Sequence, residues 1–492
     1  MEHLDQYHRG VIAEKYKIPL TLTHRQGILK VWDLLAVNGG IGATLLRYTP
    51  LHQQSFVYLL FYSVGWSLLW LLWAQTLDAY AVDALMSWDR SIRRALVAGL
   101  FTFSLVLAWL WLRYPTLPHF ADVTASLGVT LIALLLGRGA IHMILSHPRF
   151  RTRVLLIGQS EALQAAQGAL RRAHTRIYEQ AGVLQTDALH GQNGGVATPV
   201  SAPSSRSDTP YADNPQPSFS TTMTVLQMIQ KCEADLVVVA EPDPSVHHEI
   251  ERLCRDLGLQ TVPLDQWYEH LTGQVWLPQG ISQSEAMNLL GAHPLNRPWA
   301  RFLKRSFDLF WASVGAICLL PLIPWIALAI YLDSRGPIFY LQDRVGRWGR
   351  VFQIFKFRTM VPNAEQGRAV WAQENDPRVT RVGKILRKLH LDEFPQFFNI
   401  LRGEMSVVGP RPERPEFVEE LAQEMPAFRV RHEVKPGMAG WALVNYGYAS
   451  SKEDSLAKLA YDLYYIKHWS LWKDFVILMK TFVDSLTLRG RA

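Results

Sequence analysis

Two adjacent carboxylates, Asp392 and Glu393, are the residues whose types and spacing best suit chemistry at phosphorus. Such chemistry needs a nucleophile, neutralisation of negative charge and usually a divalent cation on phosphate oxygens. One carboxylate can attack, and the pair can bind Mg²⁺, which takes one or two carboxylates together with substrate oxygens. Pro395 fits the first turn of a helix, so we expect the pair at the entrance of a helix over Pro395–Leu401, where the dipole favours ionised carboxylates. An Asp-Glu pair alone is more simply an acidic first turn without chemistry.

Basic residues surround this pair in the sequence. Between Arg335 and Arg414, Lys and Arg outnumber Asp and Glu by as much as in the whole chain, whose formal net charge is +7. This surplus indicates an anionic partner. Nucleic acid is one candidate, but the apolar segment just upstream favours a phosphorylated small molecule or a lipid phosphate. The cations expected on the phosphates are Lys356, Arg358, Arg387 and Arg411, although each one singly is equally well a solvated surface charge.

The apolar segment Phe307–Leu332 is long enough, at roughly 1.5 Å per residue, to cross a bilayer. Basic residues both precede and follow it, however, and the positive-inside rule places both groups on the cytoplasmic side. Pro321 and Pro324 lie mid-segment, where each removes a helix hydrogen bond and produces a kink. We therefore predict a re-entrant helix over 304–332 that bends at these prolines. The alternative is an ordinary kinked transmembrane helix.

Five motifs in this part of the chain closely resemble, in order and spacing, those of the bacterial sugar transferases, which move a hexose-1-phosphate from a nucleotide sugar onto polyprenyl phosphate. They are Leu332–Gly349, Phe355–Met360, Asn375–Lys384, Leu391–Gln396 and Met405–Pro412. The chain length and four N-terminal apolar stretches resemble the long, undecaprenyl-phosphate galactose or glucose phosphotransferase type. The family usually has Ser-Pro at the bend and Leu-Pro-Gln after the acidic pair, where this chain has Leu320-Pro321 and Phe394-Pro395.

The resemblance implies a mainly helical, monotopic catalytic domain and a role for each motif. Asp392 is implied as the nucleophile toward the β-phosphate of a UDP-hexose, with UMP as the leaving group. Polyprenyl phosphate would then take the phosphosugar from the enzyme, and Glu393 would serve as metal ligand or acid/base. The segment Val434–Trp441 resembles the family's loop near the nucleotide, which adds Lys435 and Gly437 to the substrate-binding residues.

Four apolar stretches near the N-terminus each approach the ~20 residues of a helical span. They are Ile28–Leu46, Phe56–Trp73, Ala95–Trp111 and Val123–Leu145. Cations are concentrated before the first, between the second and third, and after the fourth, so both ends of the bundle are expected in the cytoplasm. Asp33 is expected to pair with Lys30, or else to mark a functional site.

The middle of the chain is expected to form a Rossmann-like α/β domain. Val154–Ile157 and Leu236–Ala240 have the pattern of buried strands flanked by helices. The loop after the first strand has one glycine, Gly158, where a pyrophosphate cradle needs two or three, so a structural or oligomerising role is favoured over nucleotide binding. An insertion over 190–220, rich in Gly, Ser and Pro, is expected to be disordered.

Together these interpretations describe a multi-pass protein of the bacterial inner membrane with three parts. Residues 1–150 hold an N-terminal tail and four transmembrane helices, 151–296 the α/β domain, and 297–492 the catalytic domain on the cytoplasmic face, with its re-entrant helix at 304–332. The expected reaction starts polysaccharide, O-antigen or exopolysaccharide assembly with Mg²⁺ as cofactor. Expected partners are UDP-hexose (galactose or glucose), undecaprenyl phosphate, membrane lipids and a second copy in a homodimer, not nucleic acid. The alternatives are a non-catalytic scaffold of polysaccharide export and a membrane-tethered nucleotide sensor.

Overall fold

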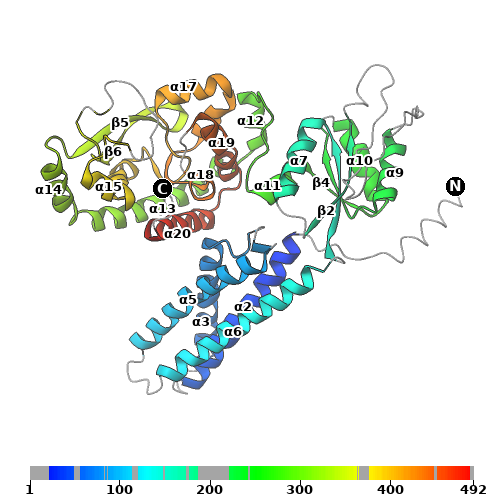
Figure 1. Ribbon diagram of the computed structural model, residues 1–492, viewed down its shortest axis with the longest axis horizontal. Coiled ribbons are helices and arrows are strands. Elements are labelled where there is room, and N and C mark those ends of the chain that lie inside the picture. The colour runs from blue at the N-terminus through cyan, green and yellow to red at the C-terminus, as the bar shows by residue number, and fades with distance from the viewer. Residues whose placement is uncertain are drawn as a thin grey trace. The chain divides into compact units, whose positions relative to one another are not determined.

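The computed structural model describes residues 22–48, 56–81, 84–85, 87–113, 120–147, 150–172, 177–186, 221–241, 244–362, 364, 376–447 and 451–487. The insertion predicted over 190–220 lies outside the described residues. The chain divides into two compact units, Met1–Leu271 and Thr272–Ala492. Helices predominate in both (Figure 1).

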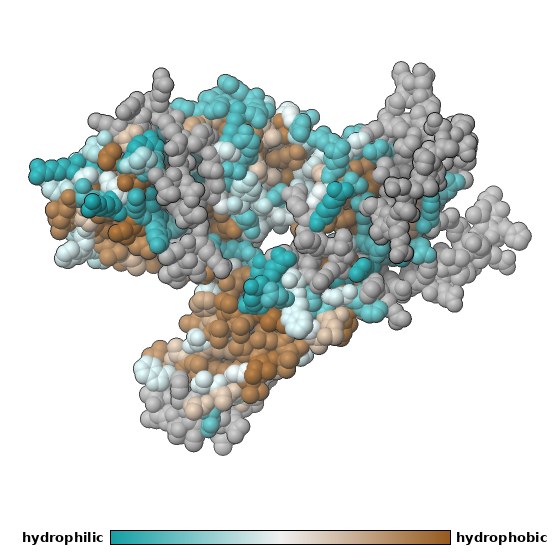
Figure 2. All heavy atoms as spheres, in the orientation of Figure 1, coloured by the Kyte–Doolittle hydropathy of each residue, from teal (hydrophilic) through white to brown (hydrophobic). Residues whose placement is uncertain are grey.

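Long helices lie at all four apolar stretches of the first unit. They are α2 (Leu22–Tyr48), α3 (Phe56–Thr76), α5 (Trp88–Arg113) and α6 (Phe120–Leu145). Helix α2 packs against α3 and α6, and α5 packs against the same two helices. Among the described residues, Trp88–Leu112 and Ala121–Leu145 are long and apolar enough to cross a membrane. Apolar residues dominate the surface of this bundle (Figure 2), as expected for a membrane-associated protein.

A buried ion pair joins two helices of the bundle. The Arg138 guanidinium donates to both carboxylate oxygens of Asp33, at 2.8 and 2.6 Å, and both side chains are fully buried. Tyr80 donates a third hydrogen bond to Asp33 at 2.6 Å. The predicted pairing of Asp33 with Lys30 is wrong, because the Lys30 ammonium lies over the Tyr80 ring instead. A buried carboxylate needs several strong donors, which Arg138 supplies from the facing helix.

A small parallel sheet forms the other part of the first unit. Its strand order is β2 (Tyr178–Gln185), β1 (Thr152–Gly158), β3 (Leu236–Ala240) and β4 (Gln260–Pro263). The connecting helices are α7 (Ser160–Arg172), α9 (Thr221–Cys232), α10 (Pro244–Asp256) and α11 (Leu264–Thr272). Strands β1 and β3 pair in parallel and their central residues are buried, as is usual where helices cover both faces of a sheet. Both predicted strands are present.

The second unit packs its elements around one large apolar cluster and a smaller one formed by Leu319, Ile330, Phe357 and Leu386. In chain order they are α12 (Gln283–Leu290), η3 (Pro294–Asn296), α13 (Pro298–Leu319), α14 (Ile323–Asp333), β5 (Phe339–Val345), η4 (Arg347–Gly349), β6 (Val351–Phe357), α15 (Arg381–Lys388), η5 (Leu391–Glu393), α16 (Gln396–Arg402), β7 (Ser406–Val408), α17 (Pro415–Glu424), η6 (Pro426–Glu433), β8 (Gly437–Ala439), α18 (Trp441–Tyr446), α19 (Lys452–Lys467) and α20 (Leu471–Thr487). Strands β5 and β6 pair antiparallel, and β7 and β8 pair in parallel.

The core of this unit begins before Arg297, the residue at which the sequence analysis places the start of the catalytic part. Val275, Ile281 and Leu290 are buried in the same cluster as residues of α16 and α19. The segment 272–296 therefore packs with the second unit, while the three-part division of the chain stays a prediction.

Helices α13 and α14 meet at a break of three residues, where their axes bend by 60°. Pro321 lies inside the break, and Pro324 lies at the start of α14, where a missing N–H costs no hydrogen bond. The sequence predicted both prolines at the bend. Ile317, Trp325 and Leu332 are largely exposed, so the bent pair offers apolar side chains to a membrane. Counted as one broken span, the pair is a third apolar segment long enough for a bilayer in the described part of the chain.

Candidate active site

Asp392 and Glu393 lie in the short turn η5, between α15 and α16. Each is only 5 % exposed. The helix expected over Pro395–Leu401 is present as α16, with Pro395 at its N-cap, so the acidic pair lies one short turn before it. His390, which precedes the pair, has a left-handed backbone with φ of 56°, a conformation that costs a non-glycine residue free energy and recurs at functional sites.

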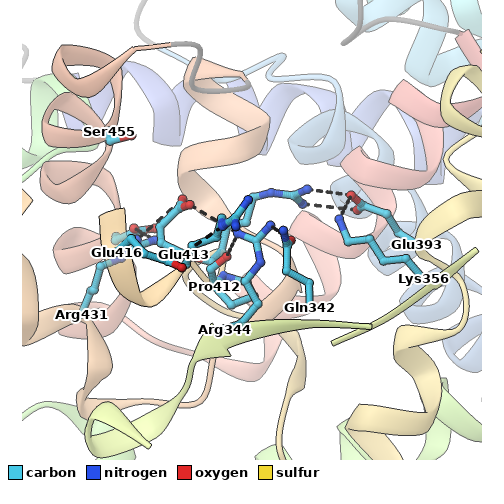
Figure 3. Close-up of polar contacts among 12 residues, drawn as sticks. Gln342, Arg344, Lys356, Glu393, Pro412, Glu413, Glu416, Arg431 and Ser455 are labelled. Carbon is cyan, nitrogen blue, oxygen red and sulfur yellow. Dashed lines mark hydrogen bonds and ion pairs between the residues drawn. The ribbon is translucent and has the colours of Figure 1, made fainter. Parts of the chain in front are cut away.

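Glu393 is held between two cations that the sequence analysis had assigned to phosphate binding. The Arg411 guanidinium donates to both carboxylate oxygens, at 2.6 and 3.2 Å. The Lys356 ammonium, from β6, donates to Oε1 at 3.2 Å (Figure 3). The structure thus brings three predicted site residues together from three separate segments of the chain.

The Lys356 ammonium has an unusually low proton affinity. Burial lowers its pKa from 10.5 to about 8; Glu393 opposes that shift, while the nearby positive charges of Arg411 and Arg344 add to it. Three cations, Lys356, Arg411 and Arg344, thus lie close together, and Arg344 has its own carboxylate partner in Glu413 at 3.7 Å. Such a site favours the arrival of a further anion, because an anion would relieve the repulsion among the cations.

Arg344 and Arg431 support this site and were missed by the sequence analysis. Arg344, on β5, donates to the Pro412 carbonyl at 3.0 Å, and Arg431 donates to the Arg411 carbonyl at 2.8 Å (Figure 3). Arg431 in turn forms an ion pair with Asp462 at 2.7 Å, and both are buried. These contacts fix the backbone that carries Arg411. Arg344 lies inside the first family motif, which could have indicated it, whereas the burial of Arg431 has no local signal.

The other predicted phosphate ligands lie elsewhere in the second unit. Arg358 donates to the Ser334 hydroxyl at 3.0 Å and to the Ser334 carbonyl, so it caps the C-terminal end of α14. Arg387 donates to the Thr359 hydroxyl at 2.9 Å. Lys435 lines a different cavity from the one beside Glu393. Contacts with the acidic pair thus involve Lys356 and Arg411 from the predicted set.

The packing of β7 against β8 explains why residue 437 is a glycine. A Cβ atom placed on it would lie 2.0 Å from the Gly409 backbone nitrogen, so a side chain here would separate β7 from β8. The close approach of two strands requires this glycine, and that requirement holds with or without a ligand.

The donor set of the acidic pair fits Mg²⁺. Asp392 and Glu393 carry carboxylate oxygens, which are the hard ligands that Mg²⁺ prefers, and the Glu393 oxygens also accept hydrogen bonds from Arg411 and Lys356. In the described residues, no group of three or more His, Cys, Asp or Glu is placed to hold a metal by itself. Mg²⁺ commonly takes its remaining ligands from water and substrate phosphates, so the pair fits a cation that is bound together with substrate.

A cavity of about 100 Å³ adjoins Glu393. His390 and Phe394 line it on one side, and Thr481, Asp484 and Ser485 of α20 line it on the other. The Thr481 and Ser485 hydroxyls donate within α20, to the carbonyls of Ile477 and Thr481, so toward a ligand in this cavity they can act as acceptors.

Comparison with known proteins finds a family match inside the second unit. A family profile described as "Bacterial sugar transferase" matches residues 299–487. The chain is 42 % identical over 256 residues to the UDP-N-acetylgalactosamine-undecaprenyl-phosphate N-acetylgalactosaminephosphotransferase of Aeromonas hydrophila, covering 51 % of this chain and 59 % of that protein. It is 41 % identical over 202 residues to the undecaprenyl-phosphate glucose phosphotransferase of Komagataeibacter xylinus, covering 40 % of this chain and 38 % of the relative.

A third relative is covered over most of its own length. The chain is 38 % identical over 206 residues to the UDP-glucose:undecaprenyl-phosphate glucose-1-phosphate transferase of Caulobacter vibrioides, which spans 42 % of this chain and 77 % of that protein. The aligned part thus spans about half the length of the first two relatives and most of the third. The range matched by the family profile, 299–487, contains the acidic pair and both cations that hold it.

Proposed function

This chain belongs to the bacterial sugar transferase family, and on that premise we propose that it transfers a hexose-1-phosphate from a UDP-sugar to undecaprenyl phosphate. The proposed place is the cytoplasmic face of a bacterial inner membrane, and the proposed role is the first membrane step of polysaccharide assembly. The observation that supports it best is the buried Asp392-Glu393 pair beside Lys356 and Arg411, inside the matched region.

The proposed reaction has two steps at one phosphorus atom. A carboxylate oxygen of Asp392 attacks the β-phosphorus, the bond from that phosphorus to the bridging oxygen breaks, and UMP leaves with the bridging oxygen. A phosphate oxygen of undecaprenyl phosphate then attacks the same phosphorus and releases the Asp392 carboxylate. Two steps with a covalent intermediate avoid bringing two bulky phosphates together in one displacement.

Lys356 and Arg411 are proposed to bind the phosphate oxygens as negative charge develops on the leaving UMP. Their contacts with Glu393 hold both cations in position before substrate arrives, so little reorganisation is needed during the reaction. Glu393 is proposed to orient these cations and to serve as metal ligand or acid/base. Mg²⁺ bound by Asp392 or Glu393 would neutralise charge on the pyrophosphate.

We propose that the bent pair α13–α14 is a re-entrant element. Helix α14 has 11 residues, which at roughly 1.5 Å each reach only about half of a ~30 Å hydrocarbon core. The polar start of α13 is tied to the unit's interior, because Lys304 pairs with Asp474 at 2.7 Å. Both features support entry and exit on one face. We also propose that α2, α3, α5 and α6 all span the membrane and that the parallel sheet is a Rossmann-like domain suited to homodimer formation.

The reaction is tested with isolated membranes that contain the full chain, supplied with Mg²⁺, undecaprenyl phosphate and a panel of UDP-glucose, UDP-galactose and UDP-N-acetylgalactosamine. The expected result is UMP release with one or more of these donors, and a hexose-phosphate adduct on the Asp392 peptide when the lipid acceptor is omitted. If no donor yields UMP, the protein is a non-catalytic scaffold. If UMP appears only with acceptor present, and no adduct forms, transfer is direct.

A further inference from the structure

A second cavity, of about 240 Å³, lies beside the first turns of α13. Five basic side chains line it, Arg301, Lys304, Arg305, Arg347 and Lys435, together with a single carboxylate, Asp308. The proposed reaction uses none of these side chains, although the family resemblance implied substrate binding for Lys435. So many cations around one hollow are costly to hold without an anion, because their charges repel and their hydration is reduced.

Two of the five cations have structural partners. Lys304 pairs with Asp474 at 2.7 Å and with Asp308 at 3.5 Å. Arg305 donates to the carbonyls of Ile400 and Leu401, at 2.6 and 2.8 Å, and so caps the end of α16. These contacts explain why both side chains are present without any ligand.

The positive charges of the remaining three cations, Arg301, Arg347 and Lys435, are less well neutralised by nearby carboxylates. Arg347 donates from Nε to the Glu433 carbonyl at 2.9 Å; burial and Arg301 lower its pKa, and the Glu433 carboxylate opposes them without forming an ion pair. Among the ion pairs of the described residues, none joins Arg301, Arg347 or Lys435 to a carboxylate. Burial lowers the pKa of Lys435, and Arg305, Arg347 and Lys304 lower it further, with only Asp308 acting against them.

The charges around Lys435 and those around Lys356 are two separate sets. The charges that shift the pKa of Lys435 are those of Arg305, Asp308, Arg347 and Lys304. The charges that shift the pKa of Lys356 are those of Glu393, Arg411, Arg344 and Asp392. An anion bound between Arg347 and Lys435 would therefore be held by different groups from one bound at Arg411.

We propose that this cavity is a second phosphate-binding site, formed by Arg301, Arg347 and Lys435, for a phosphate group that is not the one transferred. Guanidinium and ammonium groups from three segments can contact different oxygens of one phosphate. The phosphate can belong to a membrane lipid or to a soluble ion. The neighbouring side chains Trp299 and Phe302 on α13 are exposed and apolar, which favours a lipid headgroup at the membrane surface.

The test measures binding by the purified full chain in phosphatidylcholine nanodiscs. One arm titrates radiolabelled inorganic phosphate, and the other adds phosphatidylglycerol to the nanodisc lipid and counts retained lipid by native mass spectrometry. In either arm, Arg347→Gln with Lys435→Gln is expected to weaken binding at least about tenfold. Arg411→Gln should retain that binding, and so should Arg429→Gln, which removes an exposed cation outside the cavity.

Phosphate binding that depends on Arg347 and Lys435 would identify a soluble anion, and retained phosphatidylglycerol with the same dependence would identify a lipid headgroup. The proposal is overturned if neither probe responds to the double variant, or if Arg411→Gln removes the binding as well. Two further variants separate loss of binding from misfolding. Arg301→Gln changes an exposed side chain, so it should weaken binding without affecting folding, and Lys435→Arg keeps the positive charge, so it should retain binding. The outcome is independent of UMP release, so it stands or fails separately from the proposed reaction.

Discussion

Arg411 donates to both carboxylate oxygens of Glu393, and this contact joins the loop after β7 to the turn that carries Asp392. Because Asp392 and Glu393 are neighbours, whatever holds Glu393 also limits where the Asp392 carboxylate can lie. Substitutions of Asp392 should therefore remove the attacking group, whereas substitutions of Glu393 should disturb its position.

Asp392→Asn should abolish both UMP release and the covalent adduct, since the amide keeps the shape of the side chain but is not a nucleophile. Glu393→Gln should slow turnover, while adduct formation remains detectable by mass spectrometry. The thermal unfolding midpoint of each variant in detergent is the control for folding. An adduct on the Asp392→Asn protein would show that a different residue attacks.

The activity should depend on the protonation of Lys356. With a pKa of about 8 in the folded protein, this ammonium loses its charge over a range where an ordinary lysine keeps it. We expect kcat/KM for the UDP-sugar to fall about tenfold per pH unit above that value. Lys356→Arg should move the fall to higher pH, because a guanidinium stays protonated. An unchanged profile in this variant would contradict the assignment.

The same pKa shift predicts a pH effect on stability of definite sign. The folded state releases the Lys356 proton near pH 8, while the unfolded chain keeps it up to about 10.5. The unfolded state binds more protons between these values, so the contribution of Lys356 to the free energy of unfolding rises with pH across that interval. Comparing unfolding midpoints of the wild type and Lys356→Met over this range isolates the contribution.

The ion pair between Arg431 and Asp462 should matter more for stability than exposed pairs do. Both side chains are buried and 2.7 Å apart, so Arg431→Met leaves a buried carboxylate without its charge partner and should cost about 3 kcal/mol. Arg429→Met removes an exposed pair with Glu419 and should change stability by less than about 0.5 kcal/mol. Equal effects of the two variants in thermal unfolding would contradict this account.

The break between α13 and α14 predicts the membrane topology. A reporter fused after Ala492 should lie in the cytoplasm, on the same side as one fused before Met1. Replacing Pro321 and Pro324 together with Ala should move part of the C-terminal reporter to the periplasm and lower activity, because the break loses its helix-breaking residues. Pro324→Ala alone is the control, since this proline already suits the start of a helix. A periplasmic C-terminus in the wild type would exclude re-entry.

A fragment that starts at Thr272 should be more stable than one that starts at Arg297. The shorter fragment loses the buried side chains of Val275, Ile281, Leu290 and Leu295, which should cost several kcal/mol at about 1.5 to 3 kcal/mol per large apolar side chain. The longer fragment should insert into membranes and release UMP. If the two have the same unfolding midpoint, the segment 272–296 is not part of the core.

Local patterns predicted much of the fold, and contacts across long stretches of chain account for the rest. The spacing of Pro321, Pro324 and Pro395 placed a bend and a helix start within a residue or two, because proline acts on its own turn. Apolar runs predicted the helices of the first unit and two strands of its sheet, because the pattern of apolar residues within one element reflects which of its faces is buried. Nothing local pairs Asp33 with Arg138 across the bundle.

The candidate site shows the same limit. The family motifs named Lys356, Arg411 and Glu393, which the structure brings together. They did not show that Arg358 would cap α14, or that Lys435 would line a cavity beside α13. The positions of Arg358 and Lys435 depend on tertiary packing, which decides the backbone carbonyls and charged groups that lie near each side chain. Motifs indicate which residues are present, but their partners follow only from the packed structure.

Strands β7 and β8 are three residues each, and Gly409, which directly follows β7, lies so close to Gly437 of β8 that no side chain fits between them. Arg411 follows the first strand closely, and Lys435 stands just before the second. The two cations therefore lie near opposite ends of one parallel strand pair. Replacing Gly437 with alanine would push these strands apart, so this one substitution should disturb the positions of both Arg411 and Lys435.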